Sequence, residues 1–245
     1  MIEVRIPTEH GYLSGVLHRP DGGGNCALVI CHGFRGSKDG GGKAVQLANE
    51  AAKLGIFVLR FDFTPLQSLS NQISEVGYAV DYCRRFVSPR VLLLGRSMGG
   101  SASLVFAAKD KNIAGLCLWA TPCNLHATFR LALGEGYEKL VRGERLYICD
   151  NYGKLELGPE FLHDLSRHNL FAALQSLPPI PILIVHGNQD EIVPLSQAHA
   201  LYEQAAPTKE LIVIDGADHH FTGHSEQAIA ATLRWLKMWF CSGSI

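Results

Sequence analysis

The sequence lacks the long apolar segments and the charge excess that mark several large classes of protein. Its longest apolar runs, such as CALVIC and IPILIV, are far shorter than the ~20 residues that a helix needs to cross a bilayer. Lys and Arg number 22 and Asp and Glu number 23, so the net charge is −1. No overall field then attracts nucleic acid or anionic lipid. We therefore expect neither a membrane nor a nucleic acid as a partner.

A secretory leader and paired cysteines are also missing. Acidic Glu3 stands near the N-terminus, and no apolar segment of a signal peptide follows it. The seven cysteines are odd in number and include no C-x-x-C pair, which favours reduced, mostly buried thiols over a disulfide framework or a zinc site. We expect a cytoplasmic protein with no metal site and no cofactor.

The 245 residues, 47% hydrophobic and 18% charged, are those of an ordinary globular chain, and we expect one domain over residues 1–245. Strand-length apolar runs alternate with helical patterns, one of which spaces Ile73, Val76 and Val80 along one helix face. Strands that are apolar on both faces and separated by helices predict a parallel sheet covered on both sides, an α/β fold. The expected strands are 13–17, 26–31, 56–62, 90–95, 113–120, 181–187 and 210–215, and the expected helices are 43–54, 70–87, 98–109, 194–206 and 225–240.

One interval, residues 122–177, is much longer than a usual connection between strands. We interpret it as a small cap insertion, mainly helical with a hairpin around Asp150 to Lys154, that lies over the sheet edge where the strands end. Its aromatic side chains either form an apolar acyl pocket or pack against the main domain. These side chains include Tyr137, Tyr147 and Tyr152.

The stretch RVLLLGRSMGG carries the strongest chemical signal. A buried strand leads into Gly95-x-Ser97-x-Gly99 and then into a helix rich in small residues. This is the pattern of a nucleophile elbow, in which a serine on a strained strand-to-helix turn exposes its hydroxyl at the carboxyl edge of the sheet. The backbone N–H of Met98, at the start of that helix, would face a negative oxygen nearby.

A serine hydroxyl needs a base, and the base needs an orienting acid. Asp190 follows the strand over 181–187, and the adjacent pair His219 and His220 follows the strand over 210–215. The chain order Ser, Asp, His is the one that elbow-type hydrolases use. We predict Asp190 as the acid, with capping of the following turn as the alternative, and favour His219 over His220 as the base.

A second donor to the oxyanion is expected after the strand over 26–31, where His32-Gly33 opens a flexible loop. The Phe34 backbone N–H can face the Met98 amide from this loop, and these two amides would form the oxyanion hole. We interpret His32 itself as structural.

The chain resembles the serine α/β-hydrolase superfamily over nearly its full length. The motifs that carry the resemblance are Gly95 to Gly99, the His32-Gly33-Phe34 segment, Asp190 and His219. Within this superfamily, FVLRFDF, the medium cap and GADHHF are similar to small cinnamoyl and feruloyl esterases and to serine aminopeptidase-type relatives. The resemblance implies an α/β-hydrolase fold with a mostly parallel eight-stranded sheet, antiparallel only near its start, and hydrolysis through an acyl-enzyme. Residues 63–68, after Asp62, depart from the Gly-His-Gly-type turn of many relatives, which leaves the substrate open.

Two other sites fit the sequence poorly. The segment GSKDGGGKA places Ser37 and Ala44 where a phosphate-binding loop needs Gly and Ser or Thr, and His220 and His224 have no glutamate to complete a zinc-protease pattern.

The functional prediction is therefore a serine hydrolase that acts on a small or medium carboxylic ester as its small-molecule partner. The same machinery could instead cleave an amide or a thioester, and the scaffold could have become a binding module. The oligomeric state stays open.

Overall fold

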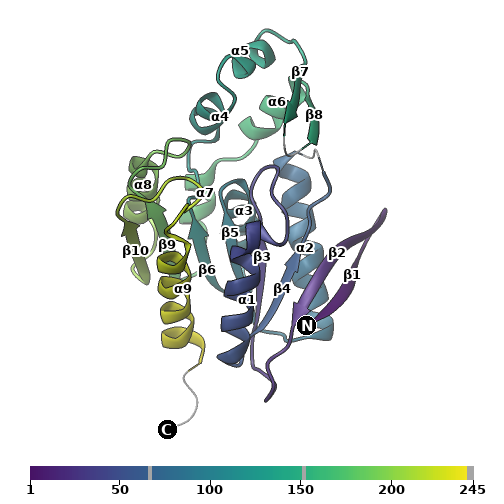
Figure 1. Ribbon diagram of the computed structural model, residues 1–245, viewed down its shortest axis with the longest axis vertical. Coiled ribbons are helices and arrows are strands. Elements are labelled where there is room, and N and C mark those ends of the chain that lie inside the picture. The colour runs from purple at the N-terminus through teal and green to yellow at the C-terminus, as the bar shows by residue number, and fades with distance from the viewer. Residues whose placement is uncertain (66–67, 151–152, 242–245) are drawn as a thin grey trace.

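The computed structural model of the protein describes residues 1–65, 68–150 and 153–241, and it is built around one large β-sheet. Eight strands lie in the order β1-β2-β4-β3-β5-β6-β9-β10 (Figure 1). β1 and β2 pair antiparallel with each other, β2 pairs antiparallel with β4, and all remaining pairs are parallel. This confirms the predicted α/β class and the mostly parallel sheet. The strands are β1 (Ile2–Thr8), β2 (Gly11–His18), β3 (Ala27–Cys31), β4 (Phe57–Phe61), β5 (Val91–Arg96), β6 (Ile113–Trp119), β9 (Ile182–Gly187) and β10 (Lys209–Ile214).

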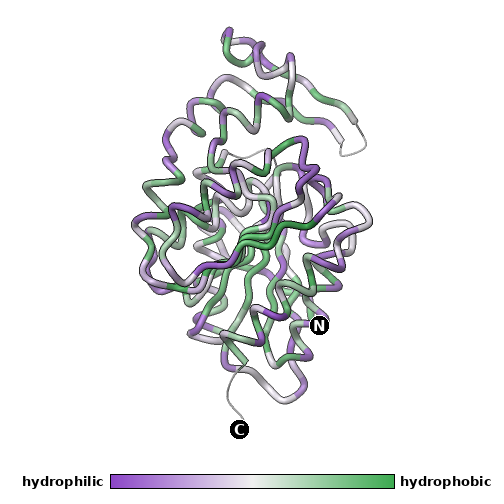
Figure 2. Tube along the Cα trace, turned by 90° about the vertical axis from the view of Figure 1, so that its left-hand side faces the viewer, coloured by the Kyte–Doolittle hydropathy of each residue, from purple (hydrophilic) through white to green (hydrophobic). Residues whose placement is uncertain are grey.

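Helices cover both faces of this sheet, as Figures 1 and 2 show. Alternate side chains of each strand enter two separate hydrophobic clusters, so that Val29 and Leu93 face one side and Leu28 and Leu92 face the other. The first side carries α2, α3 and α8, and the second carries α1 and α9. The bounds are α1 (Lys43–Lys53), preceded by a 3₁₀ turn at Gly40–Gly42, α2 (Leu69–Phe86), α3 (Met98–Asp110), α8 (Leu195–Gln204) and α9 (Ser225–Phe240).

No helix among the described residues has both the length and the apolar composition that a bilayer crossing requires. All seven cysteines lie in the described ranges and are free thiols, and four of them are buried. Burial raises the pKa of Cys31, Cys83 and Cys117 to about 12, which keeps these groups protonated. Their position in the core is the one that the sequence predicted.

After β6 the chain forms a separate group of elements at one end of the molecule, at the top of Figure 1, and the last helix before β9 returns to the side of the sheet. Its two strands pair antiparallel from Leu146 with Leu157 to Asp150 with Gly153, where the sequence predicted a hairpin. Residues 151–152 between them, Tyr152 included, lie outside the described residues. The elements are α4 (Leu125–Leu133), α5 (Glu135–Val141), β7 (Leu146–Asp150), β8 (Gly153–Leu157), α6 (Glu160–Ser166) and α7 (Leu170–Gln175). We call β7, β8 and the helices α4 to α6 the cap.

The cap is attached to the sheet edge where the parallel strands end. The ring of Phe34, which follows β3, lies 5.2 Å from that of Phe129 and 5.8 Å from that of Phe161, both in the cap. Asp164 of α6 accepts hydrogen bonds from the backbone N–H (3.0 Å) and the hydroxyl (2.5 Å) of Ser70 in α2. These contacts hold the cap over the loops that carry the candidate site residues Ser97, Asp190 and His219.

The sequence singled out two cap tyrosines that the structure describes, Tyr137 and Tyr147. Among the described residues, neither tyrosine contacts Ser97. Tyr137 is buried within the cap, where its hydroxyl lies 2.9 Å from His126 Nδ1. The Tyr147 side chain is 68% exposed. Packing, rather than an acyl pocket, accounts for Tyr137.

Candidate active site

Ser97 lies on the strained turn between β5 and α3. Its φ of 53° and ψ of −127° are rare for a residue with a side chain. The two neighbouring glycines are required by close approach of backbone, because a Cβ on Gly95 would lie 2.4 Å from the Gly100 Cα and one on Gly99 would lie 2.2 Å from the His32 carbonyl oxygen. The local geometry is therefore that of the elbow expected from the sequence.

Gly99→Ala is expected to damage the site without touching a reacting atom. The new methyl group would collide with the His32 carbonyl, so the loop that carries Phe34 has to move. Overpacking of this kind costs roughly 1–3 kcal/mol of unfolding free energy. Thermal unfolding and ester hydrolysis of the purified variant should both fall, whereas Gly22→Ala, where the Cβ meets open space, should leave both unchanged. If the two variants had the same unfolding temperature and the same activity, the close approach of the Gly99 Cα to the His32 carbonyl would be contradicted.

Three side chains from distant parts of the chain form one hydrogen-bonded series at this edge. The His219 Nε2 lies 3.1 Å from the Ser97 Oγ, and the His219 Nδ1 lies 2.8 Å and 3.0 Å from the two Asp190 carboxylate oxygens. The side chains are nearly buried, with Ser97 6% and His219 5% exposed. Because a carboxylate only accepts, Nδ1 carries the hydrogen, and the bare Nε2 is left to accept from the Ser97 hydroxyl.

His220 is not part of this series. Its Nδ1 lies 3.0 Å from an Arg96 guanidinium nitrogen, and its ring packs edge-on against that of His219, with 5.5 Å between centroids. Burial and nearby Arg96 lower the pKa of His220, so its ring stays neutral near pH 7. Arg96 donates to the His219 carbonyl oxygen at 2.9 Å and Lys43 donates to that of His220 at 2.8 Å. The side chains of Arg96 and Lys43 thus fix the backbone of the loop that carries His219 and His220.

Asp190 also has the capping role that the sequence left as an alternative. Its Oδ1 accepts from the backbone N–H groups of Ile192 (3.0 Å) and Val193 (2.7 Å). Its Oδ2 lies 3.3 Å from the Nε2 of His186, a residue that the sequence did not single out. Burial alone would raise the pKa of Asp190, but hydrogen bonds from His186, His219 and Val193 lower it well below the usual carboxyl range. The carboxylate is therefore charged at neutral pH.

The two backbone N–H groups expected to hold an oxyanion are both free to do so. In the described part of the chain, neither Phe34 nor Met98 donates its N–H to a protein acceptor. His32 fixes the Phe34 loop, since its Nδ1 donates to the Gly33 carbonyl at 2.8 Å and its Nε2 accepts from the Phe63 N–H at 3.1 Å. Burial lowers the pKa of His32, which keeps this ring neutral and supports the structural role expected for it.

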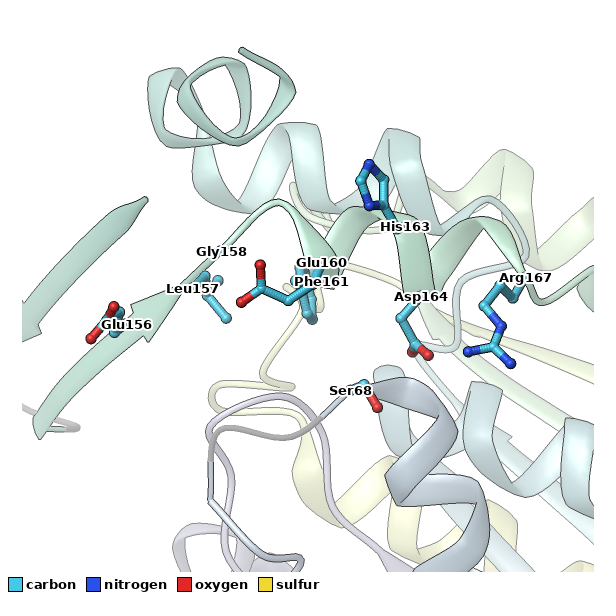
Figure 3. A pocket seen from close by; sticks show the side chains of 9 residues that line it. All are labelled: Ser68, Glu156, Leu157, Gly158, Glu160, Phe161, His163, Asp164 and Arg167. Carbon is cyan, nitrogen blue, oxygen red and sulfur yellow. The ribbon is translucent and has the colours of Figure 1, made fainter. Parts of the chain in front are cut away.

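A cavity of about 400 Å³ lies between the cap and the start of α2 (Figure 3). Phe161, which packs against Phe34, forms part of its wall, and Asp164 and Arg167 lie side by side at the end near Ser68. Ser97 is not among the lining residues, so this cavity is separate from the series around Ser97. The full lining is Ser68, Glu156, Leu157, Gly158, Glu160, Phe161, His163, Asp164 and Arg167.

Among known families, the model described as secretory lipase matches residues 154–244, less than half of the chain. Several curated proteins are also similar in sequence. The uncharacterized protein YfhR of Salmonella typhi is 30% identical over 151 residues, which are 60% of this chain and 47% of that protein. The monoglyceride lipase homolog of monkeypox virus is 24% identical over 247 residues, covering 87% of this chain and 88% of that one. The chain thus spans about half the length of the YfhR proteins that it matches.

Solved structures share the arrangement over nearly the whole chain. Est1E from Butyrivibrio proteoclasticus, in the structure with bound ferulic acid, has a TM-score of 0.85 at 21% identity and covers 96% of this chain and 98% of its own. A dienelactone hydrolase from Anabaena variabilis has a TM-score of 0.71 at 18% identity, with coverage of 98% and 97%. The chain therefore has the α/β-hydrolase fold, which is the fold that its resemblance to the α/β-hydrolase superfamily implied.

Proposed function

We propose that the protein is a serine hydrolase that cleaves small or medium carboxylic esters through an acyl-enzyme. The observation that carries this proposal is the contact of 3.1 Å between the Ser97 Oγ and the Nε2 of a His219 ring whose Nδ1 donates to Asp190. A neutral imidazole in this tautomer can take the serine proton as the oxygen attacks. The strained turn supports the same role, because it holds the hydroxyl at the start of α3.

In the first half of the reaction, the Ser97 Oγ bonds to the ester carbonyl carbon while its proton passes to His219 Nε2. Asp190 stabilises the imidazolium that forms and does not itself become protonated. The carbonyl oxygen takes up the negative charge and is held by the N–H groups of Phe34 and Met98. When the tetrahedral intermediate collapses, the C–O bond to the alcohol breaks and the alcohol leaves with the proton from Nε2.

In the second half, water takes the place of the alcohol. His219 Nε2 removes a proton from the water as its oxygen attacks the acyl carbon, and the same two N–H groups hold the oxyanion. Collapse of this intermediate releases the carboxylic acid and returns the proton to the Ser97 Oγ. Apart from the ester and the water molecule, every group that acts in these steps belongs to the chain.

The names of similar proteins support an ester as the substrate class. They include a monoglyceride lipase homolog, a secretory lipase family and a dienelactone hydrolase, and Est1E is known with ferulic acid bound.

We also propose that residues 1–245 form one domain in which the cap belongs to the insertion at 122–177. The free cysteines and balanced charge support the expected cytoplasmic location and a small-molecule partner rather than a membrane or nucleic acid.

A substrate panel tests the reaction class. Chromogenic esters graded by acyl length, aminoacyl amides and acyl-CoA thioesters are assayed side by side with the purified protein. We expect turnover of esters, with kcat/KM at least about tenfold above that of the amides, since an amide nitrogen is a poorer leaving group than an alkoxide. Faster cleavage of the amides or thioesters would assign the same machinery to those substrates, and no turnover of any class would contradict a hydrolase.

The proposed base makes activity depend on pH in a defined direction. His219 must be neutral to accept the serine proton, so kcat/KM should rise with pH as the imidazole loses its extra proton. The measurement is a kcat/KM profile of the preferred ester from pH 4.5 to 9. A flat profile from acidic to neutral pH would contradict a histidine base.

A further inference from the structure

His186 is a polar side chain enclosed in the core beside the proposed catalytic residues. It lies near the end of β9 in an otherwise apolar strand, and its side chain has no solvent exposure. Its Nε2 lies 2.7 Å from the Val193 carbonyl oxygen and 3.3 Å from the Asp190 Oδ2. Its Nδ1 is buried and has no hydrogen-bond partner within the described ranges. A polar group that is enclosed in this way calls for a physical reason.

The neighbours of the ring determine its tautomer. Both atoms that face Nε2 are oxygens that only accept, so Nε2 carries a hydrogen and donates it. A second hydrogen on Nδ1 would be a buried donor without an acceptor, which costs free energy. His186 is therefore a neutral donor whose Nε2–H goes to the Val193 carbonyl oxygen at 2.7 Å, with the Asp190 Oδ2 in polar contact at 3.3 Å.

This donor completes a cage around the Asp190 carboxylate. Among the described residues, two imidazole rings reach the Asp190 Oδ2: the His219 Nδ1 donates to it at 2.8 Å, and the His186 Nε2 lies 3.3 Å from it. The other oxygen is held by backbone N–H groups, including that of Val193. His186 thus contacts the carboxylate and also the residue whose N–H holds the opposite oxygen, which prevents rotation of the carboxylate about its Cβ–Cγ bond.

We propose that His186 is a positioning residue that holds Asp190 in the orientation in which it receives the Nδ1–H of His219. The proposal rests on the proposed function, since it assigns His186 to the support of the same series of side chains. His186 touches neither Ser97 nor the reacting atoms and acts through Asp190 alone. Its loss should lower kcat and leave KM nearly unchanged, because substrate binding does not involve it.

Loss of the donor should also change the titration of the base. With fewer hydrogen bonds, the Asp190 carboxylate becomes a stronger acceptor and favours the imidazolium form of His219. In the described part of the chain, the other titratable or charged groups that contact the face of this ring or its backbone are His220, Arg96 and Glu191. None of them changes when position 186 is substituted, so a shift reports on the contact between His186 and Asp190.

Two substitutions of similar length and volume separate donation from packing. In His186→Gln, the amide nitrogen lies the same number of bonds from Cα as Nε2 and keeps a donor, whereas in His186→Met the corresponding methyl group has none. For His186→Met we expect kcat to fall by about tenfold or more, because a buried hydrogen bond and a polar contact with a charged carboxylate are lost together, with KM within about twofold. The acid limb of kcat/KM should move to higher pH. His186→Gln should recover most of both effects.

The same shift can be measured without turnover, from the midpoint of the His219 ring titration in NMR spectra of both variants. A midpoint that rises in His186→Met and returns in His186→Gln supports the proposal even if the wild-type protein hydrolyses nothing, in which case the proposed function alone fails. If the wild-type protein hydrolyses esters through Ser97 but the two variants lose the same activity and share one midpoint, His186 only fills space. Unchanged values in both variants, or a downward shift, would equally overturn the proposal.

Discussion

Ser97→Ala is expected to abolish ester hydrolysis and to leave the folded protein intact. The variant removes the oxygen that would form the acyl bond, and His219 is left with no proton to accept in that step. Loss of the nucleophile from a triad of this kind lowers kcat by about 10⁶-fold. Alanine fits the same backbone angles as serine, so the strained turn at φ 53° persists and the thermal unfolding temperature should change little. The measurement is kcat on the preferred ester together with a thermal melt.

The matched control for this variant is Ser74→Ala, which removes an exposed hydroxyl of α2 that donates to the Ser70 carbonyl and takes no part in the hydrogen-bonded series around Ser97. It should retain wild-type kcat. Residual activity of Ser97→Ala within about tenfold of wild type, at equal foldedness, would mean that another group attacks the ester. Such a result would contradict the role proposed for Ser97.

Asp190→Asn is expected to be the second most damaging substitution, because it reverses a hydrogen bond. The asparagine oxygen can still accept from the N–H groups of Ile192 and Val193, which turns its amide nitrogen toward His219. The amide then donates to Nδ1, so the hydrogen of the ring moves to Nε2, and the ring can no longer accept from Ser97. This wrong tautomer lowers kcat by about 10⁴-fold in triads of this type. The conservative control is Asp81→Asn on the exposed side of α2, which should be without effect.

The same variant should change the dependence of stability on pH. Folding lowers the pKa of Asp190, so its stabilising contribution is fully present above the unfolded value of ~3.9 and is lost as the pH falls below it. Unfolding free energies of wild type and variant, measured with denaturant from pH 7 to 3, should therefore converge as the pH decreases. If the two unfolding free energies instead changed in parallel with pH, the result would contradict a charged Asp190 carboxylate that is stabilised by hydrogen-bond donors.

The strained turn at Ser97 was predictable because its requirements are local. A buried strand, a serine between glycines and a helix of small residues must adjoin in the chain, and close contacts at Gly95 and Gly99 explain the glycines. The same holds for most elements. The helix predicted over 43–54 runs from Lys43 to Lys53, and the strand predicted over 210–215 runs from Lys209 to Ile214, because apolar runs bounded by turn residues are local signals as well.

The choice between His219 and His220 depends on distant contacts. Arg96 and Lys43, far away in the chain, hold the carbonyl oxygens of the histidine pair, and a positive φ of 54° at Phe221 shapes the turn that follows. Neither feature can be read from GADHHF alone. The sequence could therefore favour His219 only by its expected position, and the structure places the His219 ring against Ser97.

Two further features gave weak signals in the sequence. β1 (Ile2–Thr8) was not among the expected strands, because an edge strand with a single buried side chain, Ile6, shows no continuous apolar run, and Pro7 argues against a strand interior. His186 was hidden within an apolar strand. The available signal was a polar residue in a core strand four positions before Asp190, which must find a buried partner.

The most direct test is to map where a fluorophosphonate probe reacts, since the probe bonds covalently only to a serine that an adjacent base has activated. Intact mass and peptide mapping should reveal one adduct, on Ser97, in wild type and in His220→Gln. In His219→Gln the rate of labelling should fall by about 100-fold or more. An adduct on a different residue, no adduct at all, or labelling of His219→Gln at the wild-type rate would contradict the activation of Ser97 by His219.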